Sequence, residues 1–137
     1  MKNLILFISI LSLLSCNQQT KSTDKIDPNS SATDTLNIDP VKILPDKFKV
    51  LLENQHVRVV EYSLNPGEKD EWHTHPPKSS YVVSGGKLKV YLENGETIIA
   101  DEIAGTASWS DYVGKHYVEN IGSTKVTIVL TEVKSLN

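Results

Sequence analysis

Apolar and polar residues alternate with a period of two along most of the chain from residue 45 onward. The clearest run covers residues 57–64 and ends at the breaker Asn65-Pro66-Gly67. Side chains two residues apart point to the same face of a strand, so this period is typical of half-buried strands. Similar runs predict strands at 50–53, 80–83, 87–92, 97–100, 106–109, 116–120 and 125–133.

Turn signals between these runs indicate how the strands connect. Asn94-Gly95 separates the runs 87–92 and 97–100 and predicts a tight hairpin. Turn signals recur at intervals of about 8–12 residues, which favours an all-β sandwich or small barrel. Beyond Pro45 no stretch combines a helical apolar stripe with helix caps. The pattern therefore predicts an all-β domain over residues 45–137.

The N-terminal residues follow a different pattern. Lys2 precedes an apolar run from Leu4 to Leu14, which at about 1.5 Å per residue is too short to cross a membrane core of roughly 30 Å. The run ends at Leu13-Leu14-Ser15-Cys16, which resembles the bacterial lipobox. We therefore predict a lipoprotein signal peptide at residues 1–15 and lipidation of Cys16. The alternative is an ordinary signal peptide with an accidental cysteine.

Residues 16–44 are rich in Asn, Gln, Ser, Thr, Asp and Lys, with only isolated apolar residues. Such a composition buries too little surface to order itself, so we predict a flexible polar tether that begins at the lipidated cysteine. The expected location is the bacterial cell envelope, lipid-anchored, facing the periplasm or on the outer membrane rather than in the cytoplasm. The membrane would then be a partner through the lipid anchor alone.

Composition narrows the function classes. The 137 residues carry 14 basic and 17 acidic side chains, so there is no basic excess and we expect no nucleic-acid partner. The single cysteine excludes an internal disulfide and a cysteine-based metal site.

Trp109 is expected in the core, and His56 is expected at the surface.

Two histidines stand two residues apart in His73-Thr74-His75, so on an extended segment both imidazoles point to one face. Such a pair can bind one divalent ion from one side, although an exposed pair can also be plain polar surface. His116 lies far along the chain and can join them only if its strand lies beside theirs.

The spacing of these residues resembles the two motifs of the cupin superfamily. Gly67, His73, His75 and Gly86 keep the spacing of the first motif, and Gly105, His116 and Asn120 keep that of the second. The resemblance implies a double-stranded β-helix, or jelly-roll barrel, with a metal and ligand cavity inside. It also implies metal ligation by His73, His75 and His116, and possible homodimers through strand edges.

One departure from the family pattern affects the expected chemistry. Ser79 stands where the first motif carries glutamate, with no carboxylate in its place. Three neutral imidazoles would leave a divalent ion with a charge near +2, which favours anionic oxygen ligands. The expected cofactor is one divalent transition metal, with Zn, Fe, Ni, Mn and Cu left open.

Strand parity suggests further residues around the site. If Ser79 faces inward then so does Tyr81, and if His116 does then so do Val118 and Asn120. Ser79, Tyr81 and Asn120 are therefore candidate pocket residues, and a place in the barrel core is the equal alternative for Tyr81.

Three functions remain open at this stage. The first is a lipoprotein that binds a metal and acts on a small oxygenated or anionic molecule, as a dioxygenase- or isomerase-type cupin if it is an enzyme. The second is a non-catalytic envelope protein that binds a small molecule or a metal. The third is a metal-free, degenerate cupin used for interaction. No catalytic acid–base residue stands out in the sequence.

Overall fold

The computed structural model describes residues 38–134, in which one short helix precedes nine strands. The predicted signal peptide, Cys16 and most of the predicted tether lie outside the described residues. The elements are α1 (Pro40–Ile43), β1 (Phe48–Glu53), β2 (Val57–Leu64), β3 (His73–His75), β4 (Lys78–Ser84), β5 (Gly86–Leu92), β6 (Thr97–Glu102), β7 (Ala107–Ser110), β8 (Val113–Asn120) and β9 (Val126–Val133).

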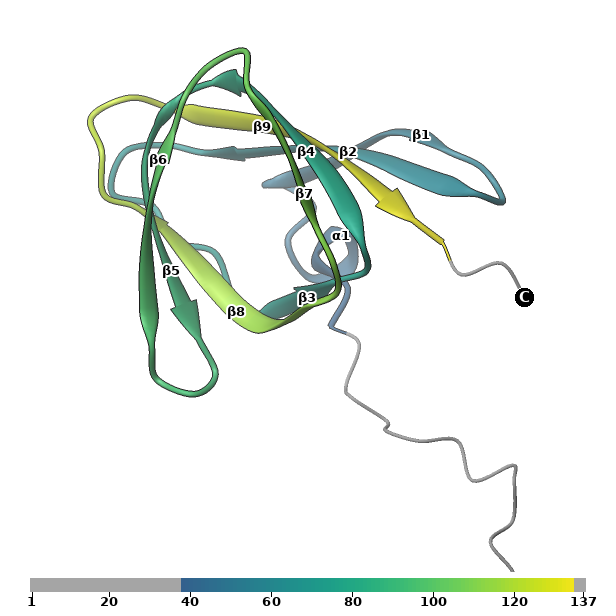
Figure 1. Cartoon of the computed structure of the whole chain (residues 1–137), viewed down its shortest axis with the longest axis horizontal. Helices are drawn as coiled ribbons and strands as arrows, with labels where there is room; N and C mark the ends of the chain where they lie inside the picture. Colours follow the sequence, from purple (N-terminus) through teal and green to yellow (C-terminus); the bar gives the residue numbers. More distant parts are fainter. Residues whose placement is uncertain (1–37, 135–137) are drawn as a thin grey trace, which may run out of the picture. The chain divides into compact units, whose positions relative to one another are not determined.

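The strands form two antiparallel sheets that face each other around a common core (Figure 1). One sheet has the order β1-β2-β9-β4-β7 and the other has the order β3-β8-β5-β6. Strands far apart in the sequence therefore lie side by side, as β2 and β9 do over their full lengths. The all-β class predicted from the alternation is confirmed, and so is the jelly-roll barrel implied by the cupin resemblance.

The core lies between the inner faces of the two sheets. On β2 the buried side chains are Val60, Tyr62 and Leu64, which alternate with partly exposed ones. The remaining buried apolar residues follow the same parity on their strands or lie in the segment around α1: Leu44, Phe48, Val82, Leu88, Val118, Val126, Ile128 and Leu130.

Ordered structure begins before the predicted domain boundary at residue 45. Asp39 caps α1 by accepting a hydrogen bond from Val41 N, and Leu44 is buried in the core. The carbonyl of Ile38 accepts a hydrogen bond from Thr74 N on β3. Residues 38–44 therefore belong to the folded unit, and the predicted tether is shortened at its C-terminal end.

The predicted strands agree with the observed ones in number and order, apart from β3. The 57–64 prediction matches β2 at both ends, and Asn94-Gly95 forms the β5–β6 turn with Gly95 at φ +86°. β3 is only three residues long, so alternation alone did not reveal it. Trp109 was wrongly predicted as core, because 58% of it is exposed on the outer face of β7.

Candidate metal centre

The three predicted histidines meet inside the barrel. His73 and His75 lie on β3, and His116 lies on the neighbouring strand β8, directly opposite His73 in the sheet register. They are exposed by only 1%, 3% and 6%, respectively. One ring nitrogen from each histidine lies within 4.8 Å of one from each of the others. Within residues 38–134 no other group of His, Cys, Asp and Glu side chains meets this criterion.

Each ring is held by a hydrogen bond at Nδ1. His73 Nδ1 bonds to the carbonyl of Glu71 at 2.7 Å, and His116 Nδ1 bonds to that of Gly114 at 2.8 Å. His75 Nδ1 bonds to Oε1 of Glu132 at 2.7 Å. Carbonyl and carboxylate oxygens only accept, so each Nδ1 carries the proton and donates it. The Nε2 lone pairs are therefore the free ligand atoms of all three rings.

Electrostatics keep the three rings neutral near pH 7. Burial, assisted by the nearby His73 ring, lowers the pKa of His75 and of His116 to about 4. Burial also lowers the pKa of His73 itself. Metal binding requires unprotonated imidazole, so no proton needs to leave these rings when a cation arrives.

A chain of charged residues behind His75 was not found from the sequence. Glu132 on β9 is 2% exposed and accepts from Arg58 Nε at 2.6 Å as well as from His75. Arg58 also donates to both carboxylate oxygens of Asp39 at 3.0 and 2.9 Å. Burial alone would raise the pKa of Glu132, but the bonds from His75 and Arg58 outweigh it and hold that pKa below its usual value.

Parity could have identified this chain. Glu132 continues the buried series Val126, Ile128 and Leu130 of β9, and Arg58 begins the series of inward residues on β2. A charged residue in the register of a buried face needs a partner, and these two strands pair. The family motif has a glutamate at the position of Ser79. In this chain a carboxylate comes instead from Glu132 on β9, and it bonds to Nδ1 of His75 rather than facing the proposed metal.

The donor set fits a divalent transition metal. Imidazole suits Zn, Cu, Ni and Fe, and a metal-bound histidine commonly donates its second N–H to a carboxylate or carbonyl, as all three rings do here. Zinc bound at about 2.05 Å by tetrahedral ligands needs its nitrogens about 3.3 Å apart. The observed separations of up to 4.8 Å require small side-chain rotations to close.

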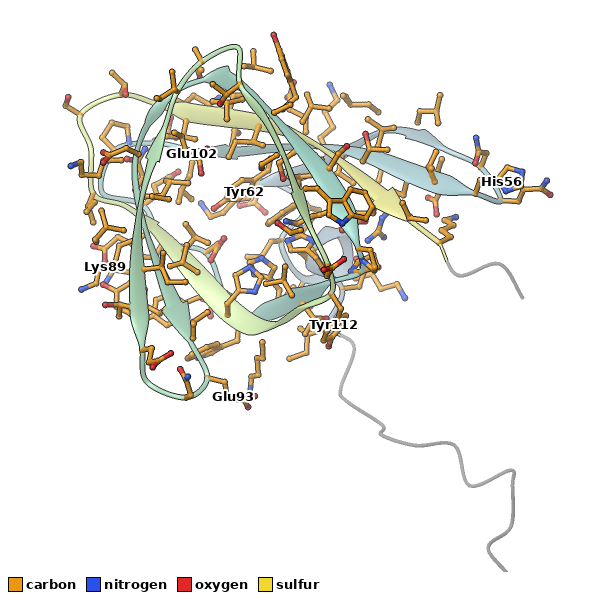
Figure 2. All side chains as sticks on the ribbon, in the orientation of Figure 1. His56, Tyr62, Lys89, Glu93, Glu102 and Tyr112 are labelled. Carbon is orange, nitrogen blue, oxygen red and sulfur yellow. The ribbon has the colours of Figure 1, made fainter. Side chains whose placement is uncertain are left out.

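A cavity of about 240 Å³ adjoins the three rings. This volume lies below the 300–1,000 Å³ of typical drug-sized sites, so it suits a small molecule. One wall, from β4 and β7, is polar and carries Lys78, Ser80, Ser108 and Ser110, and Glu102 comes from β6. The other lining residues are apolar or aromatic: Phe48, Tyr62, Leu88, Val90, Val113, Val118, Ile128 and Leu130. Figure 2 shows Tyr62 between the sheets and His56 at the tip of the β1–β2 hairpin.

None of the three predicted pocket residues, Ser79, Tyr81 and Asn120, lines the cavity. Tyr81 is 49% exposed, and neither it nor Ser79 lines the cavity. The inward residues of β4 are Lys78, Ser80 and Val82, so the predicted parity was shifted by one residue. The reason is the Pro76-Pro77 corner between β3 and β4, which ends the alternation set by the histidines.

Asn120 has the predicted parity but a different role. His116, Val118 and Asn120 are all buried on one face of β8, as expected. The Asn120 amide donates to the carbonyls of Leu64 and Thr124, and its oxygen accepts from Gly122 N. The side chain therefore joins three backbone segments and does not line the cavity.

Comparisons with known proteins address the fold. No family model and no curated protein matches the chain. Among solved structures, it resembles a cupin domain from Bordetella pertussis with a TM-score of 0.60 and 24% identity, over 64% of this chain and 92% of that one. It also resembles an RmlC-like cupin family protein with a double-stranded β-helix fold from Methanocaldococcus jannaschii. That match has a TM-score of 0.52 and 20% identity, over 63% of this chain and 77% of that one.

At these identities the likeness shows the fold. The two antiparallel sheets of this chain are consistent with that fold. The described part of the chain has the cupin double-stranded β-helix fold, with a triad of histidines close enough to bind a metal.

Proposed function

We propose that this protein binds one divalent transition metal through Nε2 of His73, His75 and His116, and presents it to a small ligand in the adjoining cavity. The observation that carries the proposal is the set of three Nδ1 donors. Each is already bonded to an acceptor, which leaves three neutral lone pairs converging on one point.

The surroundings of the rings support a transition metal rather than Mg²⁺ or Ca²⁺. Hard cations prefer oxygen ligands, whereas three imidazoles suit the later first-row ions and zinc. Glu132 makes His75 a more basic ligand through its bond to Nδ1. A metal held by neutral ligands keeps a charge near +2 and polarises an oxygen atom of a bound ligand.

A catalytic role is favoured by one residue of the cavity. Glu102 lines the cavity, and burial raises the pKa of its carboxyl. A carboxyl group that lines a ligand cavity can serve as a general acid or base, and burial shifts this one toward its protonated form. Retention of a ligand without turnover, by contrast, would make the protein a binding module.

The proposal includes attachment to the bacterial envelope through a lipid on Cys16. The lipobox-like sequence Leu13-Leu14-Ser15-Cys16 supports this step, and these residues lie outside the described part. Among residues 38–134, no helix is both long and apolar enough to span a bilayer. Cys16→Ser should move the protein from the membrane fraction to the soluble fraction, and unchanged membrane attachment would contradict the anchor.

Metal analysis tests the central step. The full-length protein, without a polyhistidine tag, is saturated with Zn²⁺, Fe²⁺, Mn²⁺, Ni²⁺ or Cu²⁺, desalted and analysed by mass spectrometry. We expect close to one ion per chain with at least one of these metals. His75→Ala should remove this binding because it deletes one of three ligands, whereas His56→Ala should retain it because His56 is an exposed hairpin residue. Sub-stoichiometric metal under all five conditions would contradict the proposal and favour a metal-free barrel.

A further inference from the structure

Lys78 is a buried lysine that lines the cavity. It is the first residue of β4, its side chain is 9% exposed, and it lines the same cavity as the three histidines. Lysine is among the residues least often buried, because its charge loses hydration there. The burial of Lys78 therefore needs a physical explanation.

No protein group within residues 38–134 neutralises Lys78 by direct contact. Its Nζ makes no hydrogen bond, and no carboxylate oxygen in this part of the chain lies within 4.0 Å of it. The acidic groups that act on it from a greater distance are Glu132 and Glu102. Glu132 is already bonded to His75 and Arg58. Burial lowers the pKa of Lys78, which is the sign of an ammonium group that lacks a close counter-charge.

The groups around Lys78 form a wall suited to an oxygen-rich ligand. In the register of β4 and β7, Lys78 faces Ser110 and Ser80 faces Ser108. All four line the cavity, so one ammonium and three hydroxyl groups lie together. The facing strand β5 contributes the apolar side chains of Leu88 and Val90. A ligand that fits this space has one polar, acidic side and one apolar side.

The wall and the histidine centre belong to the same cavity. Lys78 and the three histidines all line this one space of about 240 Å³, so one short molecule can reach both places. Among the lining residues Lys78 is the one lysine or arginine, and Glu102 adds a carboxylate. One positive and one negative side chain favour a singly charged carboxylate at Lys78 over a doubly charged phosphate.

We propose that Lys78 recognises the carboxylate of a small organic acid, whose second oxygen-bearing end reaches the histidine centre. The inference rests on the metal site proposed above and adds the substrate class: dicarboxylic, hydroxy or keto acids of about two to five carbons. Lys78 supplies the counter-charge for one end and the serine hydroxyls hydrogen-bond to it. The charge of Lys78 then receives its counter-charge from the carboxylate of the bound ligand.

The test compares ligands of equal size that differ in one charge. Zinc-saturated, full-length protein is titrated calorimetrically with malonate, succinate and glutarate, and with the monoamide of each. The wild-type protein should prefer the best diacid over its monoamide by about tenfold or more, since a charge-assisted hydrogen bond is lost with the amide. Lys78→Met should remove this preference, and Lys49→Met, which changes an exposed strand lysine, should keep it.

Two results would overturn the inference: no preference for any diacid in the wild-type protein, or the same preference in Lys78→Met. Zinc content is measured first for every variant, so failure of the metal site is seen separately. If wild-type protein binds no metal, the test is repeated on metal-free protein with propionate against propionamide. A preference for propionate that depends on Lys78 then supports carboxylate recognition, and its absence overturns it.

Thermal unfolding distinguishes recognition from a structural role. Methionine matches the lysine stem in size and needs no counter-charge, so Lys78→Met should raise Tm by several degrees without ligand. Lys49→Met should leave Tm unchanged. A fall in Tm for Lys78→Met would show that the ammonium supports the fold, and would overturn the proposal.

Discussion

The barrel contains two buried polar clusters that differ in how completely they are satisfied. Around Asn120, every polar atom of the side chain bonds to backbone: the carbonyls of Leu64 and Thr124 and the N–H of Gly122. Nearby, Asp70 accepts from Tyr62 Oη at 2.8 Å and from Val118 N. This cluster connects strands, and its side-chain polar groups are bonded within the protein.

The histidine cluster is satisfied on one side only. Its three Nδ1 atoms are bonded, which leaves the three Nε2 atoms free, and all three rings line a cavity that Lys78 also lines. These bonds fix the orientation of the rings and leave their other nitrogens free. A metal site needs this arrangement, whereas a metal-free barrel does not. The contrast shows how burial alone fails to separate structural from functional polar groups.

Removal of the Asn120 side chain should have the largest effect on stability and almost none on metal binding. Asn120→Ala deletes one buried and two part-buried hydrogen bonds to the backbone, which should cost about 4 kcal/mol in the free energy of unfolding. The measurement is urea denaturation of metal-free protein, with zinc content per folded chain measured in parallel. Strong loss of zinc from folded Asn120→Ala would place Asn120 in the metal site and break the comparison.

Acid should destabilise the metal-free protein through the histidine cluster. The pKa of His75 and of His116 falls from 6.5 to about 4 on folding, so between these values the unfolded chain binds protons that the folded protein does not. Stability therefore falls as pH falls through this window, by roughly 3 kcal/mol for each histidine. Denaturant unfolding between pH 7 and pH 4 measures the slope.

Asp70 acts in the opposite direction. Burial raises its pKa from 3.8 to about 6, so the folded protein binds this proton first and gains stability as pH falls, again by roughly 3 kcal/mol. The net loss between pH 6.5 and pH 4 is then about 3 kcal/mol. Asp70→Asn should steepen the loss, because it removes the opposing group. A flat profile in the wild-type protein would contradict neutral, buried histidines.

Glu132→Gln should weaken zinc affinity by about 10- to 100-fold, as changes to the partner of a ligating histidine commonly do. The neutral amide still accepts from His75 Nδ1 but no longer makes that ring more basic. Competition with a chromophoric chelator at pH 7 measures the change. Glu61→Gln is the matched control, because it changes a glutamate on the other face of β2, away from the cavity. Equal zinc affinities for the two variants would show that Glu132 does not strengthen metal binding through His75.

The smallest effects are expected on the outer face of β4. Ser79→Ala and Tyr81→Phe should change zinc and diacid affinities by less than about twofold, since neither side chain lines the cavity. Chelator competition measures the zinc affinity of both variants, and calorimetry with zinc-saturated protein measures their diacid affinity. A large loss in Tyr81→Phe would restore the inward orientation that sequence parity suggested.

Sequence parity succeeded where a strand is long and regular. The eight residues of β2 alternate without interruption, and His116, Val118 and Asn120 of β8 share a face as expected. The three histidines could be grouped because the two motifs have the spacing of a known fold, which places their strands side by side.

Parity failed where a strand follows a corner. Pro76-Pro77 resets the direction of β4, so Lys78 and Ser80 face inward instead of Ser79 and Tyr81.

The Glu132–Arg58–Asp39 chain was missed because it joins three distant segments, although both Arg58 and Glu132 stand in the register of buried residues. Long-range pairing of β2 with β9 is a tertiary fact that local alternation does not contain.

The most direct test of the central claim follows the histidine ring nitrogens during a zinc titration. Long-range proton–nitrogen NMR spectra of the full-length protein distinguish protonated Nδ1 from free Nε2 in each ring. Before zinc, His73, His75 and His116 should all be neutral with the proton on Nδ1. One equivalent of zinc should shift the three Nε2 signals while the signals of the exposed His56 stay unchanged. Unshifted Nε2 signals, or zinc bound through Nδ1, would contradict the account.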